Sequence, residues 1–307
     1  MPAGGPTVTV DRGVRRLGAR AIDREAWDAA VLADPLAKPY GLSWWLDAAT
    51  AGNWEGLVLD DYRLVLPLPR LRRYRVMPVH IRPPFTQQLG PFGQLRPGDL
   101  CRLLDALPRK FQTALPLAPS IPLEEIPPGF RVRRRVNYVL DLARPFAEVK
   151  RDFQKRMRQY LNRTGELEVH PVSRAAVIGL CRRHLGDRGG IREFHWERLA
   201  AIIDGAEARD QGFCRGISGG GELLCVGFYP HLNGRAYNLA AASTPAGFEQ
   251  RGMIHLLATV MRDLSGPPGA AFDFEGSELP GVREFFSRFG GQDEGYHLVE
   301  RRWYGLG

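Results

Sequence analysis

Two carboxylates near the C-terminal end are the strongest candidates for chemistry in this chain. Asp273 and Glu275 alternate with Phe272 and Phe274. On a β-strand, this alternation places both acids on one face and both aromatic rings on the other. Acids at a strand end, next to the start of a helix, stand where α/β folds place their ligands. Such an acid can act as a general base, or it can be structural and meet solvent or an arginine.

The segment after the acids is predicted to be a helix that packs through one apolar face. Val282, Phe285, Phe286 and Phe289 recur at helical spacing. Gly290 then ends the helix. These rings and the two phenylalanines of the strand are expected to form core that holds the acids in place.

A second candidate is a basic helix predicted over Phe146–Arg163. Arg151, Lys155 and Arg158 recur at i, i+4 and i+7, and Arg156 adds to the charge. Such a stripe suits the phosphates of RNA, a nucleotide or coenzyme A, and a solvated helix face is the alternative. The apolar face of this helix carries Val149, Phe153, Met157, Tyr160 and Leu161.

The tripeptide Gln250-Arg251-Gly252 stands at the beginning of a further predicted helix, which follows a strand. Free backbone amides at a helix start attract anions, and a glycine lets a phosphate approach closely. The junction could therefore hold a pyrophosphate or a carbonyl, and an ordinary helix entry is the alternative.

A polar loop in the first half offers amide side chains. Gln87 and Gln88 lie among aromatic and proline residues and could orient a polar acceptor, or the loop could simply pack on the core. Of the adjacent tryptophans, Trp44 is expected in the core and Trp45 at the rim of the site.

Other motifs argue against several enzyme classes. The GxSxG pattern around Ser218 is followed by another predicted strand, so it indicates a hairpin turn instead of a nucleophile elbow. The seven histidines show no metal-ligand spacing, and the sequence has no Walker loop and no GxGxxG. We therefore expect no metal site and no ATP or NAD chemistry.

The net charge and the cysteine content indicate the possible binding partners and the cellular compartment. The chain of 307 residues has a net charge of +8, and only four of its 42 basic residues are lysines. This balance is compatible with an anionic ligand, RNA or an anionic membrane surface. Four widely separated cysteines fit a reducing cytoplasm, and no long apolar run predicts a membrane span.

The order of predicted elements defines the fold class. Prolines between Pro116 and Pro128 mark a domain boundary near residue 130. The second half is predicted as strand, helix, strand, two helices, three antiparallel strands, helix, strand, helix and strand. We therefore predict a mixed α/β (α+β) fold with helices on partly antiparallel sheets, and neither a Rossmann domain nor a TIM barrel.

Two segments resemble the Fem-type aminoacyl transferases and their relatives. Residues 153–169, with Lys155, Arg156 and Arg158 before Gly165, look like the "K-x-R … G-hydrophobic" stretch of that group. Residues 253–290 resemble its "helix, fDfgG, helix, FG" ending. The N-terminal pieces at residues 40–45 and 87–90 are similar to bacterial proteins assigned as GNAT-like acetyltransferases.

The resemblance implies tandem GNAT-like domains, residues 1–130 and 131–307, with a cleft between them. It implies transfer of an acyl or aminoacyl group from acyl-CoA or aminoacyl-tRNA, as co-substrate, onto an amine, with no tightly bound cofactor. The acceptor would be a small-molecule or lipid-linked amine, and tRNA would be a partner of the aminoacyl branch. The protein would be cytoplasmic, with peripheral contact at the anionic inner membrane face as a variant.

Our hypothesis assigns roles to the candidate residues. Glu275 is the expected base, with Asp273 as the alternative. Gln250, Arg251 and Gly252 would meet the donor, together with Arg156 and Arg158, and substrate contacts would come from Gln87, Gln88, Trp45 and Tyr160. The competing hypotheses are a catalytically inactive GNAT-like protein that binds an anionic ligand or lipid headgroup, and an RNA-binding protein.

Overall fold

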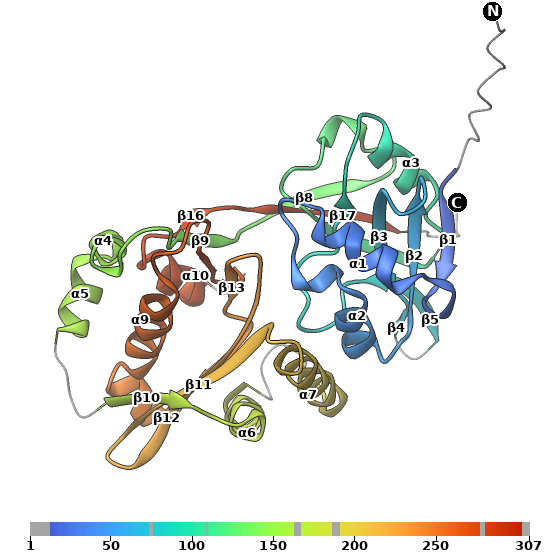
Figure 1. Cartoon of the computed structure of the whole chain (residues 1–307). Helices are drawn as coiled ribbons and strands as arrows, with labels where there is room; N and C mark the ends of the chain where they lie inside the picture. The colour runs from blue at the N-terminus through green and yellow to red at the C-terminus, as the bar shows by residue number, and fades with distance from the viewer. Residues whose placement is uncertain are drawn as a thin grey trace, which may run out of the picture.

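The computed structural model describes residues 13–73, 76–108, 110–162, 167–185, 191–276 and 280–302. The fold is mixed α/β, as predicted, with helices packed on three largely antiparallel sheets (Figure 1). Within the described part of the chain, no helix is long and apolar enough to span a bilayer.

Two sheets and three helices make up the N-terminal half. The first sheet has the spatial order β1 (Arg15–Gly18), β2 (Trp54–Leu59), β3 (Leu64–Pro69), β6 (Phe92–Gly93). The second has the order β4 (Leu71–Arg73), β5 (Met77–Ile81), β7 (Gln112–Leu117), β17 (Tyr296–Arg302), β8 (Arg131–Arg135). The helices are α1 (Arg24–Leu32), α2 (Ser43–Thr50) and α3 (Asp99–Asp105), with 3₁₀ turns at Ala19–Ala21, Pro39–Gly41 and Leu123–Glu125.

The C-terminal half is built on a single eight-stranded sheet. Its order is β10 (Leu167–Pro171), β11 (Gly212–Gly219), β12 (Glu222–Leu232), β13 (Arg235–Tyr237), β15 (Ala271–Asp273), β9 (Tyr138–Asp141), β16 (Gln292–Asp293), and β14 (Ala240–Ser243) also pairs with β12. The helices are α4 (Phe146–Asp152), α5 (Lys155–Leu161), α6 (Arg174–Leu185), α7 (Glu193–Glu207), α8 (Pro245–Glu249), α9 (Gly252–Leu264) and α10 (Pro280–Ser287).

The two halves share structure across residue 130. The last strand, β17, pairs with β7 and with β8 in the N-terminal sheet, and Figure 1 shows it running beside β8. Helix α2 packs against α7, where the Trp44 indole donates a hydrogen bond to Gln211 Oε1 at 3.1 Å. The boundary near residue 130 stays a prediction, because sheet pairing crosses it.

The basic helix predicted over Phe146–Arg163 is not continuous. Phe153 and Gln154 have extended backbone conformations that separate α4 from α5. The Arg158 guanidinium donates to the carbonyls of Arg151 and Phe153 at 2.7 and 2.5 Å, which stabilises the break. The single basic stripe of Arg151, Lys155 and Arg158 is therefore wrong, and Arg163 lies outside the described residues.

The aromatic core behind the two acids is confirmed. Phe272, Phe274 and Phe289 are at most 1% exposed, and their rings form a connected set of edge and tilted contacts. Val282 is 37% exposed, so it does not belong to the packed face of α10. The rigid ring cluster fixes the backbone from which both acids project.

Candidate active site

Asp273 is the hub of a buried polar network. It is the last residue of β15 and has no exposed surface. Its Oδ2 atom accepts hydrogen bonds from Arg235 Nη2 at 2.6 Å, Arg235 Nε at 3.0 Å and Asn137 Nδ2 at 3.2 Å. Arg235 also donates to Glu294 at 2.7 Å. Because the Arg235 guanidinium already compensates its charge, a buried carboxylate of this kind stabilises the fold and is not available to accept a proton.

The N-terminal half contributes a lysine to this network. The Nζ atom of Lys38 lies 3.9 Å from Asp273 Oδ2 and 5.5 Å from the centre of the Tyr237 ring, and the residue is 2% exposed. Burial lowers the pKa of Lys38, and the nearby Asp273 carboxylate opposes that shift. Lys38 therefore joins the two halves electrostatically.

The two predicted glutamines belong to the same network. Gln88 Nε2 donates to Gln87 Oε1 at 2.8 Å, and Gln87 Nε2 donates to Asn137 Oδ1 at 3.2 Å. Asn137 then donates to Asp273. Both glutamines are at most 3% exposed. Their contact with substrate stays a prediction, but they reach the candidate acid through a single asparagine.

Glu275 is held in an unusual conformation by its neighbour. Its backbone N–H donates to Asp273 Oδ1 at 2.8 Å, and its φ is 65°, in the left-handed region. The strand ends at Asp273, so the predicted alternation of the two acids on one strand face is wrong. Left-handed backbone at a residue other than glycine persists only where the surroundings enforce it, and it is enriched at functional sites.

The Glu275 carboxyl group lies in a desolvated position. Its Oε1 atom is buried and has no hydrogen-bond partner among the described residues. Burial raises the pKa of Glu275 to about 8, and the Lys38 charge opposes the shift. A carboxyl group that titrates near neutral pH can exchange a proton with an amine, which an ordinary surface glutamate does less well.

The conformation of Glu275 depends on the following glycine. Gly276 has a φ of 57°, and an added Cβ would lie 2.1 Å from the Val136 carbonyl oxygen. We expect Gly276→Ala to lower the free energy of unfolding by about 2–4 kcal/mol, because the backbone must move. Gly129→Ala is the matched control, since Gly129 has a φ of 89° with no atom within 4 Å of a Cβ, and it should cost about 1 kcal/mol. Equal losses in chemical denaturation would contradict the steric argument.

Further buried polar atoms around Asp273 have no hydrogen-bond partner among the described residues. The ring of Tyr40 contacts that of Tyr237 at 5.6 Å, and the Asn238 backbone N–H donates to the Asp273 carbonyl at 2.8 Å. Leaving such atoms unpaired is costly, so a polar ligand or water is expected to satisfy them. The unpaired atoms are Tyr40 Oη, Gln88 Oε1, Tyr237 Oη, Asn238 Oδ1 and Glu275 Oε1.

Two strands diverge next to these atoms. β13 pairs in parallel with β15 as far as Tyr237 and Asp273. Beyond Asn238 the chain continues as β14, which pairs with β12 and has no described pairing with β15. The third of the three predicted antiparallel strands, which was expected over residues 236–242, is therefore split into β13 and β14. Its C-terminal part, β14, leads directly to α8 and α9.

The start of α9 brings several of the predicted donor-binding residues together. Gly252 is its first residue, and an added Cβ would lie 2.9 Å from Cys225 Sγ. Arg251 precedes it with a φ of 59°. The guanidinium groups of Arg251 and Arg156 lie 5.2 and 5.7 Å from the centre of the Tyr160 ring. Two cations therefore flank one ring beside the first residue of α9.

Two predicted residues, Arg158 and Trp45, lie differently from what their roles require, and the donor contact of Gln250 stays a prediction. The Arg158 guanidinium is directed to backbone carbonyls of its own helix pair. Trp45 is 0% exposed and donates to Thr86 Oγ1 at 3.2 Å, so it is core, whereas the partly exposed Trp44 is the rim residue. Gln250 is exposed at the end of α8, and its Oε1 atom lies close to Gly219.

The serine in the GxSxG pattern lies in a hairpin, as predicted. Ser218 is on β11, and β12 follows after the turn at Gly220 and Gly221. His170 Nε2 lies 2.9 Å from Ser218 Oγ, but the other ring nitrogen faces the Pro171 carbonyl at 3.1 Å. No described carboxylate orients this imidazole, so the pair lacks the acid of a hydrolytic triad.

The sequence did not indicate four members of the network: Lys38, Asn137, Arg235 and Glu294. They come from four separate segments and carry no shared motif. The rarity of lysine in this chain was the one available signal for Lys38. In the described part of the chain, no group of three or more histidine, cysteine or acidic residues could hold a metal ion.

Comparison with known proteins defines the class of fold. No protein-family profile matches the chain, and no curated protein is similar in sequence. FemX is similar in structure at 12% identity, with a TM-score of 0.69 over 93% of this chain and 96% of that protein. The C-terminal domain of a protein from Agrobacterium fabrum, assigned as a lysylphosphatidylglycerol synthetase, is similar at 14% identity, with a TM-score of 0.59 over 92% of each chain.

A conserved protein of unknown function from Bacteroides thetaiotaomicron is also similar, at 11% identity, with a TM-score of 0.57 over 94% of this chain and 99% of that one. The chain therefore has the fold of FemX and of the synthetase-assigned domain. At these identities the likeness defines the fold, and the chemistry must be argued from the site.

Proposed function

We propose that this protein transfers an acyl or aminoacyl group from an activated donor to a primary amine. The observation that carries the proposal is Glu275, a desolvated acid with a left-handed backbone and an unpaired, buried Oε1 atom. The fold of FemX and of the synthetase-assigned domain supports a transferase of this kind.

The polar atoms around Asp273 suit an ammonium group. An ammonium presents three donors and no acceptor. Gln88 Oε1, Asn238 Oδ1 and the Glu275 carboxylate offer unused acceptors. The acceptor amine would dock among them and lose a proton to Glu275. The free nitrogen lone pair would then attack the donor carbonyl.

The tyrosine hydroxyls would assist the second part of the reaction. Burial raises the pKa of Tyr237, so its hydroxyl stays protonated and can donate to the oxyanion of the tetrahedral intermediate. The attack forms the C–N bond, and the nitrogen of the intermediate then releases its second proton to solvent. Collapse of the intermediate breaks the bond to the thiol sulfur or ribose oxygen and leaves the amide. Glu275 would return its proton to this leaving group.

The donor would lie along β14 toward α9. The segment from Asn238 to Thr244, which contains β14, spans at most about 20 Å at the rise per residue of an extended chain. Helix amides at Gly252, with Arg251 and Arg156, would bind the donor phosphates. Acyl-CoA and aminoacyl-tRNA both have phosphates at a distance from the reactive carbonyl, so either donor fits this route.

The pH dependence of transfer tests the proposal. We expect kcat/KM for transfer to a primary amine to rise with pH and to level off above about 8, because only the Glu275 carboxylate accepts a proton and its pKa is raised to about 8. The measurement is product formation by mass spectrometry, with acyl-CoA and aminoacyl-tRNA donors tested in parallel against a panel of amines.

The matched control is Glu275→Gln. In this variant the rise of kcat/KM with pH, which levels off above about pH 8 in the wild type, should be absent. A rise that persists in the variant would assign the titration to another group, such as the substrate amine. Absence of transfer from both donors to every amine would reject the proposed function.

A further inference from the structure

Lys38 is a buried lysine in a chain that uses arginine for almost all of its positive charges. Only four of the 42 basic residues are lysines, and Lys38 is 2% exposed. A buried ammonium group is costly unless it is closely paired. Its Nζ atom lies 3.9 Å from Asp273 Oδ2, which is longer than a hydrogen bond. The position of Lys38 therefore requires a reason beyond a simple ion pair.

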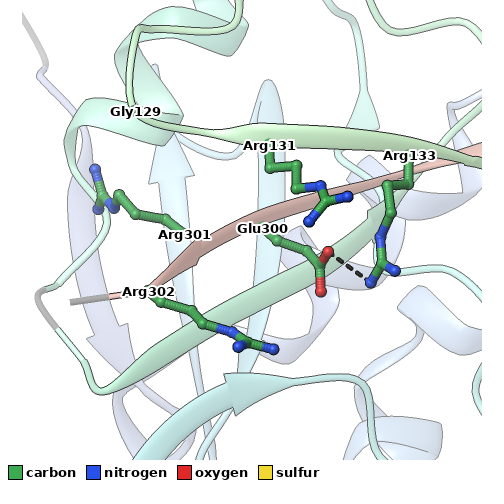
Figure 2. Close-up of a pocket in the computed structure, with 6 residues that line it drawn as sticks. All are labelled: Gly129, Arg131, Arg133, Glu300, Arg301 and Arg302. Atoms are coloured by element: carbon green, nitrogen blue, oxygen red, sulfur yellow. Dashed lines mark ion pairs between the residues drawn. The ribbon is translucent and has the colours of Figure 1, made fainter. Parts of the chain in front are cut away.

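Other ion pairs of this chain have a closer geometry. In the recess over β8 and β17, Arg133 and Glu300 are 2.7 Å apart, and the arginine side chain is 44% exposed (Figure 2). Asp273 also has a close partner, since Arg235 donates to its Oδ2 atom at 2.6 and 3.0 Å. The charge of the more distant Lys38 therefore exceeds what Asp273 requires.

We propose that Lys38 is a positioning residue for the transfer reaction: its ammonium group supplies the positive charge that lets Glu275 ionise inside the buried network. The inference rests on the proposed function, in which the Glu275 carboxylate accepts a proton from the amine. The Glu275 Oε1 atom is buried and has no hydrogen-bond partner among the described residues. A carboxylate in that position depends on nearby positive charge to be stable.

A single carboxylate connects Lys38 to Glu275. Asp273 Oδ2 faces the Lys38 ammonium, and Asp273 Oδ1 accepts the backbone N–H of Glu275 at 2.8 Å. Burial lowers the pKa of Lys38, and the Asp273 carboxylate opposes that shift and so favours the ammonium form. Burial raises the pKa of Glu275 to about 8, and the Lys38 charge opposes that shift in turn. Coulomb interactions are strong here because little water screens them.

The chain around Lys38 holds the ammonium group at the site. A 3₁₀ turn, Pro39–Gly41, begins directly after Lys38, and the Gly41 N–H donates to the Lys38 carbonyl at 3.2 Å. The ring of Tyr40 in this turn contacts the Tyr237 ring, which lies 5.5 Å from Lys38 Nζ. The Tyr237 hydroxyl stays protonated because burial raises its pKa. The N-terminal half thus fixes a charge beside a base that belongs to the C-terminal half.

The number of charges in the network fits this role. Its two cations are Lys38 and Arg235, and its two carboxylates besides Glu275 are Asp273 and Glu294. The charges are balanced while Glu275 is protonated. Ionisation of Glu275 leaves one excess negative charge, which the ammonium group of the acceptor would balance. Without Lys38 the excess would be two negative charges, so Glu275 would keep its proton at neutral pH.

The first test is the pH profile of transfer in Lys38→Met. Without the charge, Glu275 should ionise at a pH at least about one unit higher, so kcat/KM at pH 7 should fall at least about tenfold. The profiles of the variant and the wild type should converge at high pH, where Glu275 is ionised in both. The matched control is Lys150→Met, which removes the same charge from a partly exposed lysine on α4 and should leave the midpoint within about 0.3 pH unit.

The second test follows the Glu275 proton without any substrate. In difference infrared spectroscopy, the C=O stretch of the protonated carboxyl group disappears as Glu275 ionises, and its absence in Glu275→Gln identifies the band. The midpoint should rise in Lys38→Met and in Lys38→Gln, a second neutral variant, and should stay unchanged in Lys150→Met. Thermal unfolding verifies that each variant is folded.

An unchanged midpoint in both neutral variants, with transfer slowed equally at every pH, would overturn the proposal and make Lys38 purely structural. A shifted infrared midpoint without transfer to any amine would reject the proposed function, and the effect of Lys38 on Glu275 would stand.

Discussion

Replacing Glu275 by glutamine is expected to slow transfer to an amine about a hundredfold or more. The substitution keeps the shape of the side chain and removes its ability to accept a proton. A positioned general base contributes roughly 10²–10⁴-fold to a proton-transfer step. The rate constant kcat is the quantity to measure, at about pH 8 and at saturating concentrations of both substrates, so that chemistry is separated from binding.

Stability distinguishes this catalytic effect from damage to the fold. The pKa of Glu275 is raised from 4.5 to about 8, so the folded state binds this proton more tightly than the unfolded state. Wild-type stability should therefore fall as pH rises from about 4.5 to about 8. Glutamine carries no charge to desolvate, so Glu275→Gln should be more stable than the wild type above about pH 8.

The matched control is Glu284→Gln on α10, where the native carboxylate is exposed and pairs with Arg288. Its kcat should stay within about twofold of the wild type, since exposed pairs of this kind contribute little. A Glu275→Gln variant that retains full kcat would exclude Glu275 from proton transfer and leave Asp273 as the acid to test.

Replacing Asp273 by asparagine is expected to cost about 3 kcal/mol or more in the free energy of unfolding. Asp273 has no exposed surface and compensates the charges of Arg235 and Lys38. Removing one partner of a buried ion pair leaves an uncompensated charge in the interior, which typically costs about 3–5 kcal/mol. Urea denaturation at neutral pH measures this loss.

Two further variants identify the source of the loss. Asp293→Asn breaks an exposed pair with Arg134 at 3.0 Å and should cost less than about 1 kcal/mol. Lys38→Met in the Asp273→Asn background removes the buried ammonium group that has lost its carboxylate partner. It should therefore restore part of the free energy of unfolding. If Asp273→Asn unfolds like Asp293→Asn, the network is not the electrostatic anchor described above.

The order of the predicted elements was sufficient to predict the class of fold. The alternation of Phe272 and Phe274 with two acids correctly predicted that both rings are buried, but it did not predict that Asp273 is buried as well. The same pattern could not distinguish the roles of Asp273 and Glu275. That distinction depends on Arg235, Asn137 and Lys38, which are distant in sequence and meet only when three sheets have formed.

Two predictions from the sequence were wrong for identifiable physical reasons: the continuous basic helix and the exposure of the two adjacent tryptophans. Helical periodicity continues across Phe153, so the break between α4 and α5 is invisible without the carbonyl contacts of Arg158. Trp44 and Trp45 are adjacent, and their exposure depends on α7, which packs against α2 from the other half. In both cases a long-range or side-chain contact outweighs the local pattern.

The return of β17 to the N-terminal sheet has a consequence for biosynthesis. A ribosome that has delivered β7 and β8 must still add the residues from Val136 to Gly295 before the strand between them exists. At the usual elongation rate of about 5–20 residues per second, synthesis of these residues takes roughly 10–30 s. During that time β7 and β8 lack the strand that pairs with both of them. Until β17 is added, the arginines of β8 are expected to oppose pairing of this exposed strand with other chains, because charged side chains at a strand edge disfavour aggregation.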